Sequence, residues 1–216
     1  MKAAIIGGGV IGGGWAARFL LNGWTVDVVD PAPGAEAAVD AVLARARRSL
    51  PMLYDRSLPH EGALRFVGSL AEAVADADWV QESVPERLDL KLAVLRQVSA
   101  LAPAHAVIGS STSGLSPPDL NPEGARVIVT RPADPLYLLP LVELAGRGTD
   151  RAAEILRGLG LYPLVLAAEE TGGQVASRLQ GAVWREALAL IRDGTATTEQ
   201  IDAAIRMGFG LCWAQT

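Results

Sequence analysis

The sequence is poor in the residues that build disulfides, metal centres and membrane spans. It has one cysteine and two histidines in 216 residues, so an internal disulfide is impossible and no metal site is predicted. No apolar run is long enough to cross a bilayer, and an apolar strand that starts at Lys2 leaves no room for a cleaved signal peptide. The net charge of −5 argues against a general nucleic-acid binder. We therefore expect a cytoplasmic protein with neither nucleic acid nor membrane as a partner.

Glycine, in contrast, is concentrated near the start of the chain. An apolar run over 2–6 leads into Gly7, Gly9 and Gly12, which fit G-x-G-x-x-G, and 15–21 has helical character. In a dinucleotide-binding turn these glycines allow a tight turn, a close backbone approach to the pyrophosphate, and close packing of helix on strand. The first N–H groups of the helix then face the phosphates. We interpret the segment as a dinucleotide-binding unit; a scaffold that has lost its ligand is the alternative.

An acidic residue follows the next predicted strand. The apolar strand 25–29 ends in Asp30, at about the 20-residue spacing that the dinucleotide-binding fingerprint requires. A carboxylate there can accept hydrogen bonds from both ribose hydroxyls of NAD and would repel a 2′-phosphate. The segment 31–34 has no arginine or lysine to hold such a phosphate. The sequence therefore predicts NAD(H) rather than NADP(H).

Strands and helices alternate along most of the chain. This alternation predicts an α/β fold of the Rossmann type, with a doubly wound, mostly parallel sheet, in a domain that spans 1–168. The further strands are predicted at 64–67, 79–84, 106–110, 126–130, 141–144 and 164–166. The helices after the first are predicted at 35–50, in a short segment after Ser69, at 86–101 and at 150–159.

The pattern changes in the last part of the chain, 169–216, which we expect to form a short, incomplete helical domain. Apolar residues recur every four positions in a long predicted helix over 174–191, and a second helix is predicted over 198–207. Two helices with apolar faces and no third partner cannot bury those faces alone. The sequence therefore predicts a homodimer or a missing segment.

Five blocks that recur in one order give the chain a resemblance to a known family. They are the glycine stretch through 14–19 and the segments 80–86, 110–114, 134–143 and 177–187. Together they resemble the 3-hydroxyacyl-CoA dehydrogenase family. The most similar branch is that of L-carnitine dehydrogenase and L-gulonate 3-dehydrogenase (lambda-crystallin), which acts on free 3-hydroxy acids. Members of the family continue beyond the point where this chain ends, with more of a helical dimerisation domain.

The resemblance implies a reaction and a set of site residues. The family oxidises a secondary alcohol at C3 with NAD, and a histidine held by a glutamate removes the hydroxyl proton. A serine and an asparagine bind the substrate oxygen, and a second asparagine faces the cofactor. Glu143 corresponds to the glutamate, Ser113 to the serine, and Glu86 and Lys91 to a pair beside the nicotinamide. The implied NAD contacts are Gly7, Gly9, Val10, Ile11, Gly12, Asp30, Val84, Glu86, Lys91, Ser113 and Asp134.

The chain departs from the family where the family carries its catalysis. The histidine lies twelve residues before the glutamate, in a His-Pro-x-Asn-Pro context, where this chain has Arg131 and Asp134. The other asparagine corresponds to Ser177, for which a small helix-packing residue is the structural alternative. Neither His60 nor His105 lies in a segment that could replace the histidine. The predicted catalytic set is Arg131, Glu143, Ser113 and Ser177.

The arginine changes what the site can do. A general base should titrate near the working pH, whereas an arginine keeps its proton in proteins. Deprotonating it near neutrality costs on the order of 7 kcal/mol, at about 1.4 kcal/mol per pH unit. Arg131 is therefore a fixed cation that can polarise a carbonyl, clamp a carboxylate, or pair with Glu143 or Asp134. Three functions stay open: an NAD(H)-dependent oxidoreductase acting on a small anionic substrate, an NAD(H)-binding sensor or accessory subunit, and non-redox chemistry on an anionic substrate.

Structural roles are the alternatives for several of these residues. A buried Glu143 could serve only to pair with Arg131. The hydroxyls of 111–113 could simply cap the next turn, since serine and threonine favour such places. Glu86 and Lys91 could be a solvated pair on a helix face.

Overall fold

The computed structural model of the chain describes all residues except 56, 122–125, 168–174 and 214–216 and the side chain of Cys212. The chain divides into two compact units, 1–173 and 174–216. No helix among the described residues is long and apolar enough to cross a membrane.

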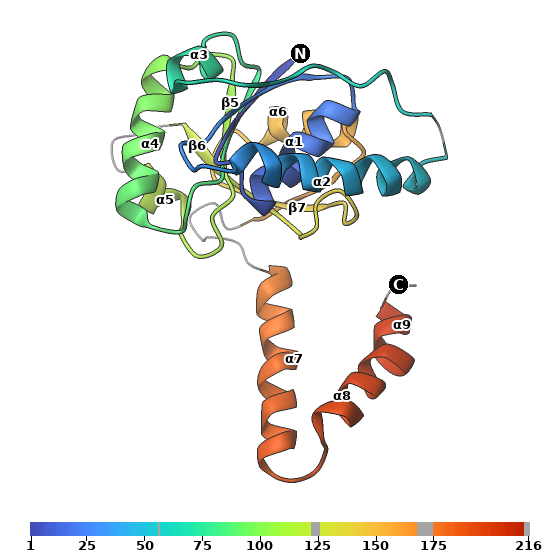
Figure 1. The fold of residues 1–216 in the computed structure, drawn as a ribbon. Helices are drawn as coiled ribbons and strands as arrows, with labels where there is room; N and C mark the ends of the chain where they lie inside the picture. The colour runs from blue at the N-terminus through green and yellow to red at the C-terminus, as the bar shows by residue number, and fades with distance from the viewer. Residues whose placement is uncertain (56, 122–125, 168–174, 214–216) are drawn as a thin grey trace. The chain divides into compact units, whose positions relative to one another are not determined.

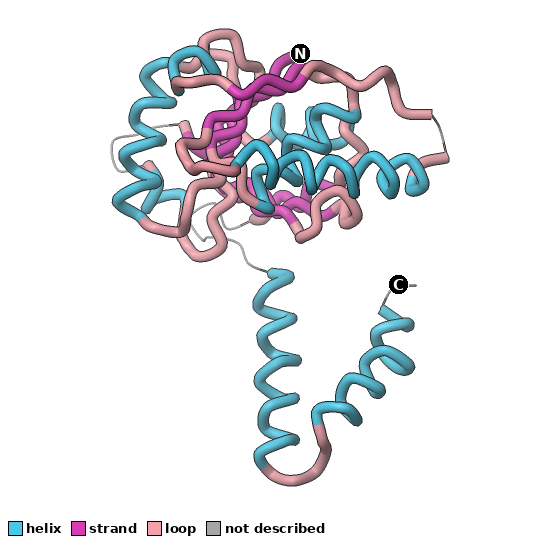
Figure 2. The backbone as a smooth tube through the Cα atoms, in the orientation of Figure 1, coloured by secondary structure: helices cyan, strands magenta, loops and turns pink. Residues whose placement is uncertain are grey.

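The first unit is built on an eight-stranded sheet, drawn in magenta in Figure 2. The strands are β1 (Lys2–Ile6), β2 (Thr25–Val29), β3 (Leu64–Phe66), β4 (Trp79–Glu82), β5 (Val107–Ser110), β6 (Val127–Pro132), β7 (Leu141–Ala145) and β8 (Tyr162–Val165). Their order is β3-β2-β1-β4-β5-β6-β7-β8, and all neighbours are parallel except β6 and β7. The chain reverses its direction of travel across the sheet between β1 and β4, which is where ligands bind in doubly wound folds.

Helices cover both faces of this sheet (Figure 1). They are α1 (Val10–Leu21), α2 (Ala35–Ser49), α3 (Leu70–Val74), α4 (Leu88–Leu101), α5 (Pro117–Leu120) and α6 (Asp150–Gly158), with a 3₁₀ turn at Leu50–Leu53. Side chains of α1, α2 and α6 share one hydrophobic core with the sheet, and side chains of α3, α4 and α5 share the other. The predicted doubly wound, mostly parallel sheet is confirmed.

Strand β1 shows why the sheet needs a helix layer on each side. All five of its residues are buried, and successive side chains point to opposite faces. Ala3 and Ile5 therefore belong to the α1 and α2 core, and Ala4 and Ile6 to the core with α3 and α4. A strand buried on both faces reads as a continuous apolar run, as it does here.

The structure differs from the predicted ranges mainly at the ends of elements. The helix predicted to begin at residue 86 begins at Leu88, because the Arg87 N–H instead closes a turn onto the Pro85 carbonyl oxygen at 2.7 Å. Helix α5 had no predicted counterpart. Its first turn is capped by the Ser116 hydroxyl, a local signal that spans too few residues to produce a helical period.

The second unit is helical. It contains α7 (Val175–Arg192), α8 (Thr198–Ala204), a π-helical turn (Ile205–Phe209) and α9 (Gly210–Trp213). The two predicted helices are present, but the second ends at residue 204 and the chain then continues as the π turn and α9. Exposed large apolar side chains lie along α7, at Val175, Leu179, Trp184, Leu188 and Ile191.

Candidate functional site

The glycine turn has the backbone geometry that binds a phosphate. Gly7 has a φ of +102°, a left-handed conformation that L side chains rarely adopt, and a Cβ on Gly12 would lie 1.8 Å from the Gly7 carbonyl oxygen. A Cβ on Gly9 would instead meet nothing within 4 Å. Gly9 also caps α1 without a side-chain hydrogen bond, so the first N–H groups of α1, from Val10 and Ile11 onward, face the open side. The turn therefore fits a pyrophosphate in front of Gly9.

Asp30 lies at the end of β2, where the ribose of a dinucleotide would bind. Its carboxylate accepts hydrogen bonds from the N–H groups of Gly8 (2.6 Å) and Ala32 (2.8 Å), which hold it against the glycine turn. It also lines an open cavity of about 660 Å³ between the ends of β2 and β3 and the start of α2. The charged residues in the described lining of this cavity are Asp30, Glu36 and Asp40, all acidic. This lining agrees with the predicted preference for NAD(H) over NADP(H).

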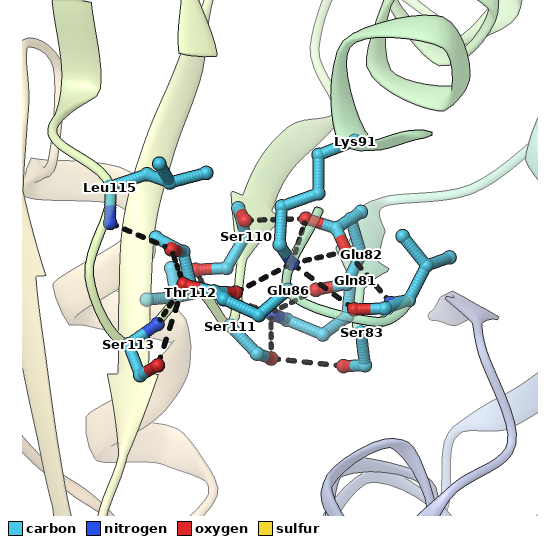
Figure 3. A network of polar contacts seen from close by, with 12 residues as sticks. Gln81, Glu82, Ser83, Glu86, Lys91, Ser110, Ser111, Thr112, Ser113 and Leu115 are labelled. Carbon is cyan, nitrogen blue, oxygen red and sulfur yellow. Dashed lines mark hydrogen bonds and ion pairs between the residues drawn. The ribbon is translucent and has the colours of Figure 1, made fainter. Parts of the chain in front are cut away.

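A polar network joins the loops that follow β4 and β5 (Figure 3). One carboxylate oxygen of Glu86 accepts hydrogen bonds from the Thr112 hydroxyl (2.5 Å) and from the N–H groups of Ser113 (2.9 Å) and Gly114 (3.0 Å). Partial burial by itself would raise the pKa of Glu86, but the Thr112 hydroxyl, the Lys91 ammonium and the two N–H groups outweigh it and lower that pKa. Glu86 is therefore an ionised carboxylate near neutral pH that fixes the position of Ser113.

Lys91 is the buried cation of this network. Its ammonium lies 2.8 and 3.1 Å from the two carboxylate oxygens of Glu82 and 3.3 Å from Oε2 of Glu86. Its side chain is only 1% exposed, because this face of α4 packs against the sheet. The alternative of a solvated helix-face pair is therefore wrong. The Val84 carbonyl oxygen also accepts a hydrogen bond from Lys91 (3.2 Å).

The three hydroxyl residues after β5 have separate roles. The Ser111 hydroxyl lies 3.0 Å from Trp15 Nε1, 2.8 Å from Gln81 Nε2 and 2.9 Å from the Ser83 hydroxyl, within a largely buried polar cluster. The Thr112 hydroxyl oxygen accepts the hydrogen bond of the Leu115 N–H at 3.0 Å, so the turn-capping alternative holds for Thr112. Ser113 is exposed, and its hydroxyl lies 3.4 Å from Glu86 Oε1.

Arg131 and Glu143 occupy facing positions in the antiparallel pair of β6 and β7. Nη1 of Arg131 lies 3.8 Å from Oε2 of Glu143, and the two side chains are 20% and 3% exposed. The register of the strands therefore brings the predicted cation and the predicted glutamate together near the carboxyl end of β6.

Asp134 lies in the loop that connects these two strands, and its side chain is exposed. Leu136 in the same loop is buried against α1, where its carbonyl oxygen accepts a hydrogen bond from the buried Arg18 Nε at 2.7 Å. Gly14 leaves room for this contact, since a Cβ there would lie 3.3 Å from the Leu136 Cβ. The glycine-turn helix thus holds the loop that carries Asp134.

The structure brings most of the predicted residues to one edge of the sheet. The glycine turn, Asp30 and the Glu86 network follow the carboxyl ends of parallel strands, and Arg131 lies near the carboxyl end of β6. Ser177 belongs to the second unit, on α7. His105 precedes β5, at the opposite edge, with Nε2 3.5 Å from Asp78. The sequence did not indicate three residues that hold the site together: Gln81, Glu82 and Arg18. The only sequence signal for them is that each is a polar residue within an apolar segment.

Six neighbouring strands of the sheet are parallel, a glycine turn lies at the point where the strand order reverses, and an acidic residue follows β2. Together these features define a dinucleotide-binding domain of the oxidoreductase type. Comparison with protein families agrees: the NAD binding domain of 3-hydroxyacyl-CoA dehydrogenase matches residues 2–160, and the C-terminal domain of that family matches 173–215. The chain belongs to the 3-hydroxyacyl-CoA dehydrogenase family, and its cofactor is NAD.

Individual relatives place the chain within that family. It is 57% identical over 223 residues to an L-carnitine dehydrogenase/betainyl-CoA thioesterase of Ruegeria pomeroyi, covering 99% of this chain and 45% of the relative. It is 47% identical to an L-carnitine dehydrogenase of Oceanobacillus iheyensis, covering 99% of this chain and 72% of the relative. Several of the matched relatives are about twice as long as this chain.

A solved structure agrees with the fold in detail. An NAD⁺-dependent 5-formyl-3-hydroxy-2-methylpyridine 4-carboxylic acid 5-dehydrogenase superposes with a TM-score of 0.86 at 28% identity, covering 97% of this chain and 71% of that one.

Proposed function

We propose that the chain is an NAD(H)-dependent oxidoreductase that acts on a small anionic 3-hydroxy acid through an altered site, with Arg131 in the place of the family's histidine. The observation that carries the proposal is the pairing of Arg131 with the buried Glu143 across β6 and β7. In the family pattern the residue at this place is held by the same glutamate. Here the glutamate holds a permanent cation.

Each residue then has a defined part in the reaction. NAD, when bound, accepts the hydride from the carbinol carbon or returns it as NADH. Arg131 binds the substrate carboxylate or polarises the ketone oxygen, and it cannot accept the hydroxyl proton. The Ser113 hydroxyl, held in place by the Glu86 network, donates a hydrogen bond to the substrate oxygen. The proton of the alcohol passes to water.

The substrate class follows from this cation and from the relatives. A guanidinium matches a carboxylate in bidentate geometry. The relatives named above carry L-carnitine dehydrogenase in their names. Carnitine has a 3-hydroxyl and a carboxylate that a guanidinium can bind, together with a quaternary ammonium. L-Carnitine is therefore the first substrate to test, followed by other short 3-hydroxy acids and their ketone forms.

The apolar side chains along α7 support a homodimer. Leu179 and Trp184 are each more than 60% exposed in the second unit, and a second copy of the chain could cover large apolar side chains of this kind. We expect light scattering to give twice the mass of the chain. A monomer would contradict this part of the proposal. The cytoplasmic location stays a prediction.

The test combines cofactor binding and turnover. NADH is titrated into the purified protein while tryptophan quenching is followed, and NAD reduction is then measured with L-carnitine and the 3-hydroxy acids. We expect saturable binding and turnover of at least one carboxylate substrate. Arg131→Met should raise its KM about tenfold or more, the loss expected for one charge-assisted contact.

Two outcomes would contradict the proposal in different ways. Absence of NADH binding would leave the glycine turn as an unused scaffold. Binding without turnover of any 3-hydroxy acid, in either direction, would make the protein an NAD(H) binder rather than an oxidoreductase. A matched control, Arg47→Met, removes an exposed arginine on α2 that is paired with Glu61, and it should leave both measurements unchanged.

A further inference from the structure

Both lysines of the chain are buried and paired with carboxylates. Two of its 19 basic residues are lysines, Lys2 and Lys91, and both are buried (8% and 1% exposed). Lys2 pairs with Asp27 and Asp76 near the start of the sheet. Lys91 pairs with Glu82 and Glu86 at the candidate site. A buried ammonium is tolerated only when its charge is compensated, so the partners of Lys91 decide where it lies.

Glu82 is the fully buried partner. It is the last residue of β4 and is 0% exposed. Its oxygen Oε1 accepts hydrogen bonds from the Val84 N–H (2.7 Å) and Lys91 Nζ (2.8 Å). Its oxygen Oε2 accepts the Ser110 hydroxyl (2.5 Å) and Lys91 Nζ (3.1 Å). The donors come from the loop after β4, from α4 and from the end of β5, so one carboxylate ties three elements together (Figure 3).

Lys91 connects the buried Glu82 to residues nearer the surface. Its ammonium lies between Glu82 and the half-exposed Glu86, whose other oxygen binds the hydroxyl of Thr112 and the N–H of Ser113. We infer that Glu82 is a positioning residue of the cofactor site: it sets Lys91, and through Lys91 it sets Glu86 and the loop that carries Ser113. The inference rests on the proposed function in assigning Glu86, Lys91 and Ser113 to the nicotinamide end of the site.

A purely structural role for Glu82 would have a different signature. It would lower the stability of the fold while leaving the site of the folded molecules unchanged. A positioning role changes the affinity for the cofactor in molecules that are fully folded. Asp27 supplies a matched control, because it is an equally buried strand carboxylate that holds the other lysine, Lys2.

The experiment compares Glu82→Gln with Asp27→Asn in NADH titrations under conditions where circular dichroism shows both to be folded. We expect Glu82→Gln to weaken NADH binding about tenfold, which corresponds to roughly 1.4 kcal/mol. Asp27→Asn should leave the NADH affinity unchanged. Equal affinities of Glu82→Gln and the unaltered protein would overturn the inference. If Glu82→Gln does not fold, Ser110→Ala, which removes one donor to Glu82, should weaken binding about twofold to threefold, and no change there would overturn it equally.

A second measurement needs no cofactor and tests whether the Lys91 amine stays protected from a reagent. Brief acetylation with acetic anhydride, followed by peptide mass spectrometry, reports each lysine separately. We expect Glu82→Gln to make Lys91 reactive and leave Lys2 protected, and Asp27→Asn to do the reverse. Protection of Lys91 in Glu82→Gln would overturn the inference. Failure of the unaltered protein to bind NADH would instead count against the proposed function, while the acetylation result would still decide whether Glu82 sets Lys91.

Discussion

Arg131 and Glu143 face each other across the antiparallel strands β6 and β7, with Nη1 and Oε2 3.8 Å apart. The glutamate is almost completely buried, so the arginine compensates a carboxylate that water does not reach. A different residue introduced at position 131 would also face Glu143. The register of the two strands, rather than any local sequence feature, fixes the pair.

Restoring the family residues should raise activity. We predict that Arg131→His, combined with Asp134→Asn and Ser177→Asn, increases NAD-linked oxidation of a small 3-hydroxy acid, because a histidine held by Glu143 can accept the hydroxyl proton. General bases contribute about 10²–10⁴ to rates, so kcat/KM should rise at least about a hundredfold. The appearance of NADH absorbance measures this. No gain would mean that the pocket has diverged beyond these three positions.

The glutamate provides the control for that variant. Adding Glu143→Gln to the triple variant should remove most of the gain, because the introduced histidine loses the carboxylate that orients it. A gain that survives this change would show that Glu143 does not hold residue 131.

Asp30 should set both the affinity for NADH and the preference over NADPH. We predict that Asp30→Ala weakens NADH binding about tenfold, because the ribose loses its acceptor, and weakens NADPH binding less, because the repulsion of a 2′-phosphate is also lost. Parallel titrations with the two cofactors measure the ratio. Glu154→Ala, at an exposed acid on α6, should change neither. An unchanged NADH affinity in Asp30→Ala would remove Asp30 from the site.

Two glycines of the turn, Gly9 and Gly12, should respond differently to alanine. A Cβ on Gly12 would lie 1.8 Å from the Gly7 carbonyl oxygen, so Gly12→Ala should destabilise the fold by roughly 3 kcal/mol or more. A Cβ on Gly9 meets no protein atom within 4 Å, so Gly9→Ala should keep its stability and weaken NADH binding. Urea unfolding and NADH titration of both variants separate the effects. Full NADH affinity in Gly9→Ala would show that the pyrophosphate does not approach this residue.

The Asp27 cluster should make the stability depend on pH. Burial alone would raise the pKa of Asp27, but hydrogen bonds from Arg65 and Lys2 outweigh it and hold that pKa below its usual value. A carboxylate with a lowered folded-state pKa contributes stability above its unfolded pKa of about 3.9 and loses it as the pH falls through the folded value. The free energy of unfolding should therefore decrease as the pH is lowered below about 5.

The variant Asp27→Asn tests whether Asp27 causes this dependence of stability on pH. We expect it to lower the free energy of unfolding at pH 7 by about 3 kcal/mol, the lower end for breaking a buried ion pair, because the Arg65 side chain is half exposed. The variant should also show a flatter decrease in acid. An equally steep decrease would assign the pH dependence to other carboxylates. Urea unfolding at a series of pH values measures both.

Much of the fold could be predicted because its signals are local and periodic. The alternation of apolar strands with helices gave the doubly wound sheet, and the spacing of Gly7, Gly9 and Gly12 gave the cofactor turn. The predicted role of Asp30 in binding the ribose follows from its place after the second strand. Short elements such as α5 could not be predicted, because four residues are too few to show the helical repeat of apolar residues.

Within the candidate site, the sequence by itself determined which side chains follow the strands and that an arginine stands in the family's histidine position. The tertiary structure alone decided which of them are partners and how deeply they are buried. Lys91 reads as a surface helix residue, yet it is buried on Glu82 because α4 packs that face against the sheet. Arg18 holds the carbonyl of Leu136, 118 residues away. Such pairs depend on strand register and on the packing of helix against sheet, which no local spacing in the sequence encodes.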